Sequence, residues 1–392
     1  MNLRRYTQKD IQRGARVLMR IEANVPIKNN RVVEGGHGRL AQVVPEIKKL
    51  SKKGAKMILI SHLGRPEGKS IKGLSLRPVA TQLSKLSGLP VKFMPEVVGK
   101  SVEKMVDTMQ DGDIVMLENL RFDSREEKNS ARFAKMLAGL GDIYINNAFG
   151  TAHRKVASAV AITKYLPSFA GDLMAKEVGE LLKPFKAPFV VLLGGIKLHT
   201  KLPMIKNVSS HSSAILTGGG IAVTFLAAKY GKPLKLDHEV ISKIEIKTAE
   251  HLLKECAGKI FVPIDFRVLR HGEKGVKTVH AREVLPEDDI FDIGHETGEL
   301  YRRILITSGS VVWNGAFGKI EDKRGEGGTE AIAKILSGLK DSRTVLGGGD
   351  TVTFVEKKGL TKKLNFVSTG GGAMMAFLAG QDMPALEPLV VK

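Results

Sequence analysis

The sequence predicts an α/β protein of two Rossmann-like domains with mostly parallel sheets that face each other across a hinged cleft. Short apolar runs rich in Val, Ile and Leu alternate along the chain with longer segments of helical spacing, which is typical of βαβ units. The runs lack polar alternation, as expected for strands that are covered on both faces. The length of 392 residues exceeds what one hydrophobic core usually supports, so two domains are expected.

Four apolar runs in each half are expected to be strands. They span 17–21, 57–60, 114–117 and 143–145, then 189–193, 214–216, 344–346 and 365–367. Helical spacing is clear at 40–50, 76–86 and 130–137, and again at 173–185 between the halves. Pro184 and Pro188 would stop that last helix, so we expect a linking hinge helix at 173–187 between domains at 1–172 and 188–375.

The residues that follow these strands differ between the two halves. In the first half they are polar or cationic: Glu22-Ala23-Asn24, Ser61-His62-Leu63-Gly64-Arg65, Glu118-Asn119-Leu120-Arg121 and 146–154. In the second half they are glycines: Gly194-Gly195, Gly218-Gly219-Gly220, Gly347-Gly348-Gly349-Asp350 and Gly370-Gly371-Gly372. Ligands of open α/β sheets bind outside the carboxyl ends of the strands. The sequence therefore predicts two facing anion sites, one lined by side chains and one by bare backbone.

The formal net charge of +20 raises the question of a nucleic-acid partner. With one Trp and five Tyr, no basic stretch is interleaved with base-stacking aromatics, and excess lysine is more often a solvated face. No apolar run approaches the roughly 18 residues of a membrane span. The lone Cys256 suits a reducing compartment. We expect a cytoplasmic protein with no nucleic-acid or membrane partner.

The cations of the first half are the candidates for binding a small, doubly anionic substrate. Each of them alone could be an ordinary surface residue, but together they converge on one crevice, and the planar fork of arginine matches phosphate and carboxylate. The set is Arg39, His62, Arg65, Arg121 and Arg154. The glycine clusters are either tight turns or places where a phosphate approaches backbone N–H groups, and nucleotide phosphates are the expected ligand.

Two further features of the second half bear on phosphate binding. Lys197 and Lys201 are four residues apart, and we expect them on one helix face as a phosphate clamp, with a solvated face as the alternative. Asp350 is either a helix N-cap or a ligand of the Mg²⁺ of a bound nucleotide. Neither a Walker motif nor a Gly-x-Gly-x-x-Gly run is present.

Taken together, these strings resemble the phosphoglycerate kinase family over nearly the whole chain and in one order. The matching segments in the first half are Asn24-Val25-Pro26, Arg39, Ser61-His62-Leu63-Gly64-Arg65-Pro66, Leu117-Glu118-Asn119-Leu120-Arg121-Phe122 and Asn147-Ala148-Phe149-Gly150-Thr151-Ala152-His153-Arg154. Those in the second half are Leu193-Gly194-Gly195-Ile196-Lys197, Lys201, Gly218-Gly219-Gly220, Asp292-Ile293-Gly294, Val312-Trp313-Asn314-Gly315, 347–351 and 368–372.

The resemblance implies a first domain that binds phosphoglycerate, to which residues 376–392 return, and a second domain that binds nucleotide. It implies transfer of a phosphoryl group between 1,3-bisphosphoglycerate and ADP by a monomer. The implied substrate residues are Glu22, Ala23, Asn24, Arg39, His62, Leu63, Gly64, Arg65, Arg121 and Arg154. Those for MgADP or MgATP are Gly195, Lys197, Lys201, Gly219, Asn314, Glu321, Gly348, Gly349, Asp350 and Thr351, with Glu321 on the ribose. Arg39 and Lys201 would flank the phosphoryl group near the N–H groups of Gly348 and Gly371. The reaction would use no general base, and closure about the hinge would bring the two substrates together.

The chain departs from the family pattern near these sites. Glu22 and Asn147 stand where the family has aspartate, as does Thr200 beside the catalytic lysine, while Ala316 replaces a proline and Asp172 an apolar residue. Loss of acids would raise the positive potential at the substrate site. Two alternatives follow: a paralogue that phosphorylates another small acid, motivated by Glu22, and a non-catalytic polyanion-binding protein on the same scaffold, motivated by the net charge.

Overall fold

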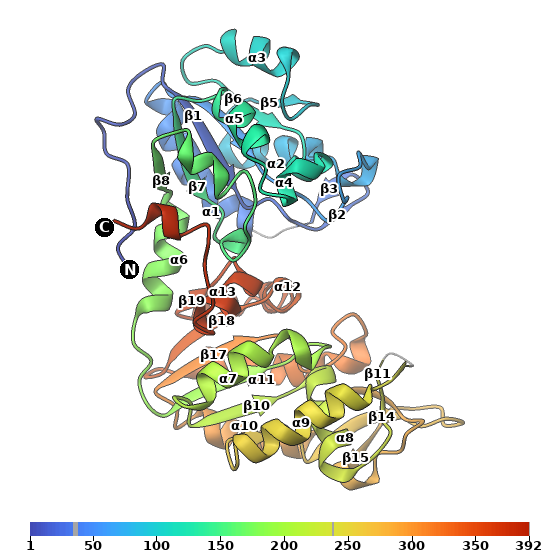
Figure 1. Cartoon of the computed structure of the whole chain (residues 1–392). Coiled ribbons are helices and arrows are strands. Elements are labelled where there is room, and N and C mark those ends of the chain that lie inside the picture. Colours follow the sequence, from blue (N-terminus) through green and yellow to red (C-terminus); the bar gives the residue numbers. More distant parts are fainter. Residues whose placement is uncertain (34–37, 237–238, 392) are drawn as a thin grey trace. The chain divides into compact units, whose positions relative to one another are not determined.

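The computed structural model describes residues 1–33, 38–236 and 239–391. Within this part of the chain there are two compact units, Met1–Leu182 with Asp382–Lys392, and Lys183–Gln381 (Figure 1). Each unit contains a six-stranded sheet in which every neighbouring pair is parallel. The expected α/β class with mostly parallel sheets is confirmed.

The first sheet has the order β5-β6-β4-β1-β7-β8. Its strands are β1 (Arg16–Ile21), β4 (Lys56–Ile60), β5 (Val91–Met94), β6 (Ile114–Leu117), β7 (Ile143–Asn147) and β8 (Ser168–Ala170). Strand β1 lies between β4 and β7, with Val17 paired to both Met57 and Ile143. The chain order reverses at this point, which is where open α/β sheets bind ligands.

Helices cover both faces of the first sheet. They are α1 (Arg39–Lys52), α2 (Arg77–Ser87), α3 (Lys100–Asp107), α4 (Ser124–Glu127) and α5 (Ala131–Ala138). Val17 and Met19 of β1 pack in one core with residues of α1 and α2, whereas Leu18 packs with residues of α3 and α5 in another. Successive side chains of a strand point to opposite faces, so burial on both sides explains the unbroken apolar runs.

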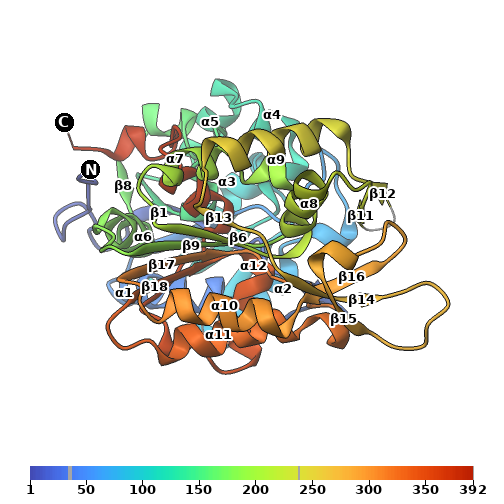
Figure 2. The same cartoon turned by 90° about the horizontal axis from the view of Figure 1, so that it is seen from below.

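The second sheet has the order β13-β10-β9-β17-β18-β19, which is the strand order of dinucleotide-binding folds. Its strands are β9 (Phe189–Leu193), β10 (Ala214–Thr217), β13 (Ile260–Phe261), β17 (Ser310–Asn314), β18 (Arg343–Gly347) and β19 (Phe366–Val367). Helices α10 (His295–Leu305) and α11 (Gly327–Gly338) lie on one face, and α7 (Leu202–Ser209), α8 (Gly219–Tyr230) and α9 (Lys243–Glu255) on the other (Figure 2). Helices α12 (Gly349–Lys357) and α13 (Gly371–Leu378) follow β18 and β19.

All eight expected strands are present, but both units contain further strands that the apolar runs did not indicate: β5 and β8 in the first sheet, and β13 and β17 in the second. The central strand β17 is one of them. A separate antiparallel sheet joins β14 (Asp265–Leu269), β15 (Lys277–His280) and β16 (Asp289–Ile293). Short hairpins pair β2 (Ile27–Lys28) with β3 (Arg31–Val32) and β11 (Lys235–Leu236) with β12 (Glu239–Val240).

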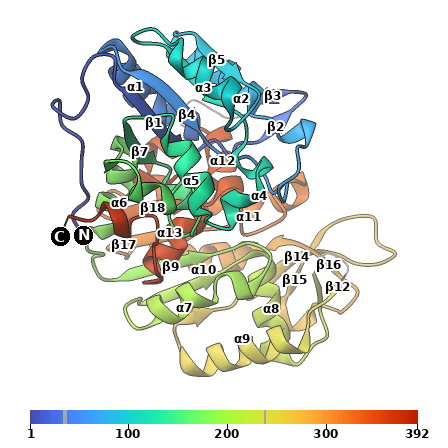
Figure 3. The ribbon, with the colours of Figure 1, turned by 45° about the horizontal axis from the view of Figure 1, so that its top comes forward.

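Both chain ends belong to the first unit and lie side by side (Figure 3). The N–H of Arg4 donates to the carbonyl of Leu389 (2.7 Å), and that of Val391 donates to the carbonyl of Asn2 (2.8 Å). Helix α6 (Asp172–Leu182) forms within the segment expected to link the halves, and it also belongs to the first unit. Its action as a hinge stays a prediction.

Candidate active site

The carboxyl edge of the first sheet brings three of the expected substrate residues into contact. Asn24 follows β1, and its Oδ1 accepts a hydrogen bond from the N–H of Gly64 (3.0 Å) after β4. Arg39 begins α1, and its Nη1 donates to the carbonyl of Asn24. The segments that follow β1 and β4 and the start of α1 are thus held together.

Asn119, which is buried, joins the loops that carry His62 and Arg121. Its Oδ1 accepts from the N–H groups of Leu63 (3.2 Å) and Arg121 (3.1 Å). Its Nδ2 donates to the carbonyls of Leu63 (2.8 Å) and Leu74 (2.9 Å). Because the amide pairs with both backbone groups of Leu63, the loops after β4 and β6 are held at a fixed distance.

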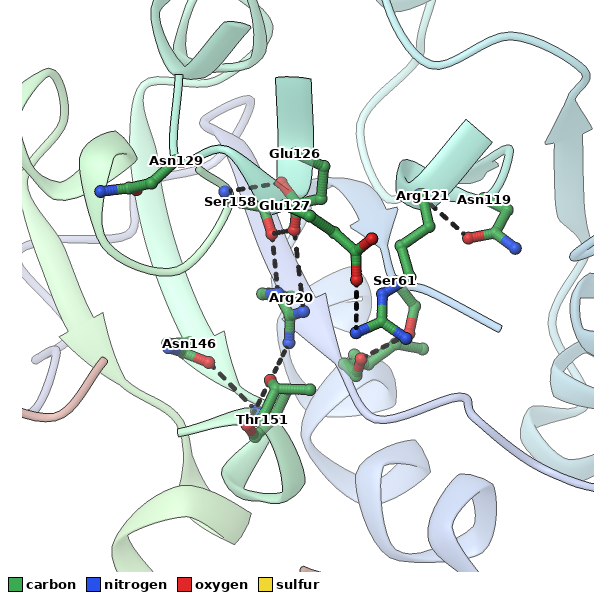
Figure 4. A network of polar contacts seen from close by, with 12 residues as sticks. Arg20, Ser61, Asn119, Arg121, Glu126, Glu127, Asn129, Asn146, Thr151 and Ser158 are labelled. Carbon is green, nitrogen blue, oxygen red and sulfur yellow. Dashed lines mark hydrogen bonds and ion pairs between the residues drawn. The ribbon is translucent and has the colours of Figure 1, made fainter. Parts of the chain in front are cut away.

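A second network fixes the loop that follows β7 (Figure 4). Arg20 points from β1 into the interior, where its Nε donates to Oγ of Ser158 (2.8 Å) and its Nη1 donates to Oγ1 of Thr151. Oε1 of Glu126, in α4, lies 4.0 Å from Nη2 of Arg20. The Glu126 carboxylate also accepts hydrogen bonds from the N–H (3.0 Å) and the hydroxyl (2.6 Å) of Ser158. Arg154 lies in the loop between Thr151 and Ser158, so this network sets its backbone position.

His62 lies among these arginines, and it is neutral at pH 7. Burial is the main cause that lowers its pKa well below 6.5, and Arg20, Arg121, Arg154 and Arg39 lower it further. Without a ligand, His62 therefore adds no charge to the cluster, unlike the arginines with which the sequence grouped it. It offers a neutral imidazole to an anion, and its Nδ1 has no partner among the described residues.

The remaining substrate candidates differ in exposure. Glu22 is buried, and its Oε2 has no partner in the described part of the chain. A side chain at Gly150 would come within 2.5 Å of that oxygen, so the glycine leaves room for the longer acid. Ala23 and Leu63 are buried in the same edge, Arg154 is half-buried and Arg65 is exposed.

Asn147 stands where the family has aspartate, but the position still has a carboxylate beside it. The expected loss of an acid is therefore compensated at this position. Its Nδ2 donates to Oε2 of Glu46 (2.6 Å), and its Oδ1 accepts from the N–H of Met174 (3.0 Å) in the first turn of α6. Glu46 also accepts from the N–H of Asp172 (2.8 Å). A carboxylate is therefore present beside Asn147, supplied by α1, and the pair holds the start of α6.

In the second sheet, the first two glycine clusters use their N–H groups within the protein. Gly194 donates to the carbonyl of Asn314 (2.9 Å) and Gly195 to that of Ala316 (2.9 Å). Gly218 and Gly219 likewise donate to the carbonyls of Leu193 (2.9 Å) and Phe317 (2.8 Å). A side chain at Gly194 would overlap the carbonyl of Ala316. These glycines permit close packing of the loops after β9, β10 and β17, and the expectation that these four N–H groups bind phosphate is wrong.

The other two glycine clusters leave N–H groups free. The N–H groups of Gly349, Asp350 and Thr351 begin α12, and those of Gly371 and Gly372 begin α13. None of these five has an acceptor among the described residues. A Cβ at Gly371 would lie 3.0 Å from Cα of Gly348, so the two helices begin beside each other. Two adjacent helix N-termini favour an anion.

Lys201 supplies a cation close to these N-termini. Its Nζ donates to Oδ1 of Asn314, whose Nδ2 lies 3.5 Å from the carbonyl of Gly371. Burial lowers the pKa of Lys201 to about 8. Lys197 and Lys201 do not share a helix face, because a single 3-10 turn (Leu198–Thr200) separates them and Lys197 is extended and exposed.

Asp350 is not a helix cap. Gly348 occupies the N-cap position of α12, and Asp350 is exposed in the first turn. The described residues contain no group of three or more His, Cys, Asp or Glu that could hold a metal. A single carboxylate beside free N–H groups nevertheless fits Mg²⁺ that arrives on nucleotide phosphates, since this ion is commonly bound by one or two carboxylates plus phosphates. Glu321 is exposed, and Thr351 is buried.

The residues that the sequence reasoning missed are those that hold the site residues in place. Arg20, Glu126 and Ser158 hold the loop that carries Arg154. Asp292, which the resemblance included without a role, holds the first turn of α11 by accepting from the N–H of Gly328 (2.6 Å). Burial raises the pKa of Asp292 to about 7. An arginine inside an apolar strand run was the available signal for Arg20.

Comparison with known proteins agrees with this geometry. The family model described as phosphoglycerate kinase matches residues 8–381. Phosphoglycerate kinase of Fervidobacterium nodosum is 39% identical over 403 residues, with 100% of this chain and 99% of that protein covered. The protein of Dictyoglomus turgidum is 38% identical over 385 residues, covering 96% of each.

Solved structures give the same result. Phosphoglycerate kinase from Pyrococcus horikoshii superposes with a TM-score of 0.86 at 29% identity, covering 98% of both chains. The Coxiella burnetii enzyme gives 0.77 at 32% identity, covering 97% of both. Across the described residues, no helix has the length and apolar character needed to cross a bilayer. The family match favours neither the paralogue nor the polyanion-binding alternative. This chain belongs to the phosphoglycerate kinase family.

Proposed function

We propose that this chain catalyses reversible phosphoryl transfer between 1,3-bisphosphoglycerate and ADP, which gives 3-phosphoglycerate and ATP. One observation carries the proposal: the carboxyl edges of the two sheets carry unlike groups, each of a kind that suits an anion. Arginines surround a neutral histidine in the first unit, which suits a small phosphorylated acid. Two helix N-termini adjoin a lysine in the second, which suits nucleotide phosphates.

The reaction needs no general base. The carboxylate of 3-phosphoglycerate has a pKa of about 4 and is already ionised at neutral pH. One of its oxygens attacks the γ-phosphorus as the bond to the β–γ bridging oxygen breaks, and ADP leaves with that electron pair. The protein then has to position the reactants and neutralise charge. We assign this to Arg39 and Lys201, with the N–H groups near Gly348 and Gly371 supporting the phosphoryl oxygens.

The remaining residues bind the two substrates. We infer that Glu22, Ala23, Asn24, His62, Leu63, Gly64, Arg65, Arg121 and Arg154 surround the phosphoglycerate. For the nucleotide we infer Lys197, Asn314, Glu321, Gly349 and Thr351, with Asp350 holding Mg²⁺ that the nucleotide brings. Gly195 and Gly219 would line the same site by their lack of a side chain, since their N–H groups are already bonded within the protein. Bound Mg²⁺ would neutralise phosphate charge.

Direct transfer requires the donor and acceptor oxygens to meet and water to be excluded. We therefore infer a movement about residues 173–187 during the reaction. We also propose that the protein works as a monomer in the cytoplasm, where its single cysteine would stay reduced. Assignment of 1–172 with 376–392 to phosphoglycerate and of 188–375 to nucleotide is part of the same proposal.

The test is a coupled assay of the full chain with MgATP and 3-phosphoglycerate. We expect turnover in the wild type, and Arg39→Ala should lower kcat by about 10²–10³, as loss of a charge-stabilising donor does. Arg132→Ala, which removes an exposed arginine of α5, should leave kcat unchanged. Absence of turnover in folded wild-type protein contradicts the function. Full activity of Arg39→Ala contradicts only the mechanism.

One observation favours a second candidate substrate, another small phosphorylated acid. Glu22 is buried with an unpartnered Oε2, so a ligand group could meet an acid one methylene longer than the family's aspartate. Comparison of the wild type with Glu22→Asp separates the candidates. If turnover of 3-phosphoglycerate appears only in the variant, the second candidate replaces the first.

A further inference from the structure

Glu127 contacts the first anion site and has no role in the function proposed above. It is the last residue of α4, and its Oε1 lies 3.2 Å from Nη2 of Arg121 (Figure 4). Nη1 of Arg121 donates to the carbonyl of Gly64 (2.6 Å). The side chain of Arg121 is 4% exposed and that of Glu127 is 42% exposed. One end of a buried guanidinium is thus fixed by backbone, and the other meets a carboxylate open to solvent.

The surroundings of Arg121 make a counter-ion necessary when no ligand is bound. Burial lowers its pKa, and the charges of Arg154 and Arg20 lower it further. Glu127 opposes this effect and favours the charged guanidinium more than Glu126 does. Glu126 is already engaged with Ser158 and Arg20. Glu127 is therefore the carboxylate that balances Arg121 at the open side of the cluster.

Neighbouring residues of α4 hold the backbone of Glu127, whereas its carboxylate is open to solvent apart from the ion pair with Arg121. Its neighbour Glu126 is buried and accepts two hydrogen bonds from Ser158. At the other end of α4, Asp123 accepts from the N–H of Arg125 (2.9 Å). The carboxylate of Glu127 can therefore turn toward water without movement of α4.

We propose that Glu127 is a built-in counter-ion that an incoming anion must displace from Arg121, and that this competition selects which anions occupy the site. The inference rests on the proposed function, in which Arg121 binds phosphoglycerate. A phosphorylated acid that contacts several arginines compensates for breaking the pair. A small inorganic oxyanion makes fewer contacts and is disfavoured.

The experiment compares wild type with Glu127→Gln, which keeps the size of the side chain and removes its charge. Binding of inorganic phosphate to the full chain is measured by calorimetry without nucleotide, and the KM for 3-phosphoglycerate by the coupled assay. Because the carboxylate of this ion pair is open to solvent, its loss should let phosphate bind about two- to fivefold more tightly to the variant. The KM should fall by a smaller factor, so selectivity against phosphate is reduced.

Glu103→Gln is the matched control, because it removes one exposed carboxylate of α3 from the same unit. Unchanged or weaker phosphate binding by Glu127→Gln overturns the inference, as does an equal gain in the control. Glu127→Ala should reproduce the gain if the cause is loss of the carboxylate. Failure of the proposed function would appear separately, as a wild type that binds phosphate but does not turn over.

Discussion

We expect the two units to bind negative charge by different means. The first would use arginine side chains whose backbone is positioned by other buried side chains: Asn119 accepts from the N–H of Arg121, and Glu126 holds Ser158 in the loop that carries Arg154. The second would use N–H groups at two helix N-termini together with Lys201. A site made of side chains can be altered by exchanging a side chain that touches no ligand. A site made of backbone is altered by adding a side chain where glycine is required.

The largest effect is expected at Lys201, the side chain that the second unit adds to its backbone N–H groups. Lys201→Ala should lower kcat by about 10²–10³, because the variant loses a charge that stabilises the moving phosphoryl group and leaves Oδ1 of Asn314 without this donor. Steady-state kinetics with both substrates measure it. Lys206→Ala, which removes an exposed lysine of α7, is the control. If Lys201→Ala kept a tenth or more of the wild-type kcat, the backbone N–H groups alone would be sufficient to stabilise the phosphoryl group in this unit.

The next largest effect tests whether side chains support the first unit. Asn147→Asp would place a second carboxylate beside Oε2 of Glu46, now 2.6 Å from Nδ2 of Asn147. Burial and Asp172 already raise the pKa of Glu46. We expect a loss of about 1–3 kcal/mol in the free energy of unfolding at pH 7.5. A raised pKa contributes stability at low pH that is lost as pH rises, so the loss should be smaller at pH 5.

Urea unfolding of Asn147→Asp at the two pH values measures this loss. The double variant Glu46→Gln with Asn147→Asp should recover most of the stability, because it restores one acid and one amide at the contact. If the double variant is as unstable as the single one, like-charge repulsion is not the cause.

A smaller effect is expected from adding a side chain to the backbone site. Gly348 has a φ of +113°, which strains any other residue, and a Cβ there would lie 3.4 Å from Nδ2 of Asn314. Gly348→Ala should raise the KM for nucleotide about tenfold, equivalent to about 1.4 kcal/mol, and leave that for 3-phosphoglycerate unchanged. Steady-state kinetics with each substrate varied will measure both constants.

Gly359 provides the matched control. Its φ is +72°, and a Cβ there would have no neighbour within 4 Å. Gly359→Ala should therefore lose stability without a change in either KM. If both variants weaken nucleotide binding equally, backbone strain in general and not the site explains the result.

The sequence was sufficient for eight strands of the two parallel sheets and for the polar residues or glycines that follow them, because double-sided burial produces unbroken apolar runs and ligands bind at strand ends. It was not sufficient for the buried residues that hold the site residues in place. Arg20 reads as part of a strand, and only the fold brings Ser158 and Glu126 to it. Pairing of Asn147 with Glu46 depends on packing between residues far apart in the chain.

The glycine clusters illustrate the same limit. All four are runs of two or three glycines, and three of them begin a helix. The N–H groups of Gly218 and Gly219, at the start of α8, nevertheless donate to carbonyls within the protein, whereas those that begin α12 and α13 have no acceptor among the described residues. Local sequence does not distinguish these uses, because both need a missing side chain. The spacing of Lys197 and Lys201 suggested one helix, but a single 3-10 turn is all that forms before Pro203.

The smallest effect expected is a pH dependence that belongs to the second unit alone. Because burial lowers the pKa of Lys201 to about 8, half of the free enzyme should lack this charge at pH 8 and about nine-tenths at pH 9. The kcat/KM for MgATP should fall about twofold from pH 7 to pH 8, and Lys201→Arg should remove the fall, since arginine stays charged.

The effect of Lys201 on stability has the opposite sign. In the unfolded chain its pKa is near 10.5, so between pH 8 and 10.5 the unfolded state binds more protons than the folded state. This group therefore disfavours folding less as pH rises. Alkaline unfolding would lower activity and stability together. A decline in activity with no loss of stability, absent from Lys201→Arg, would therefore identify the lysine as its source.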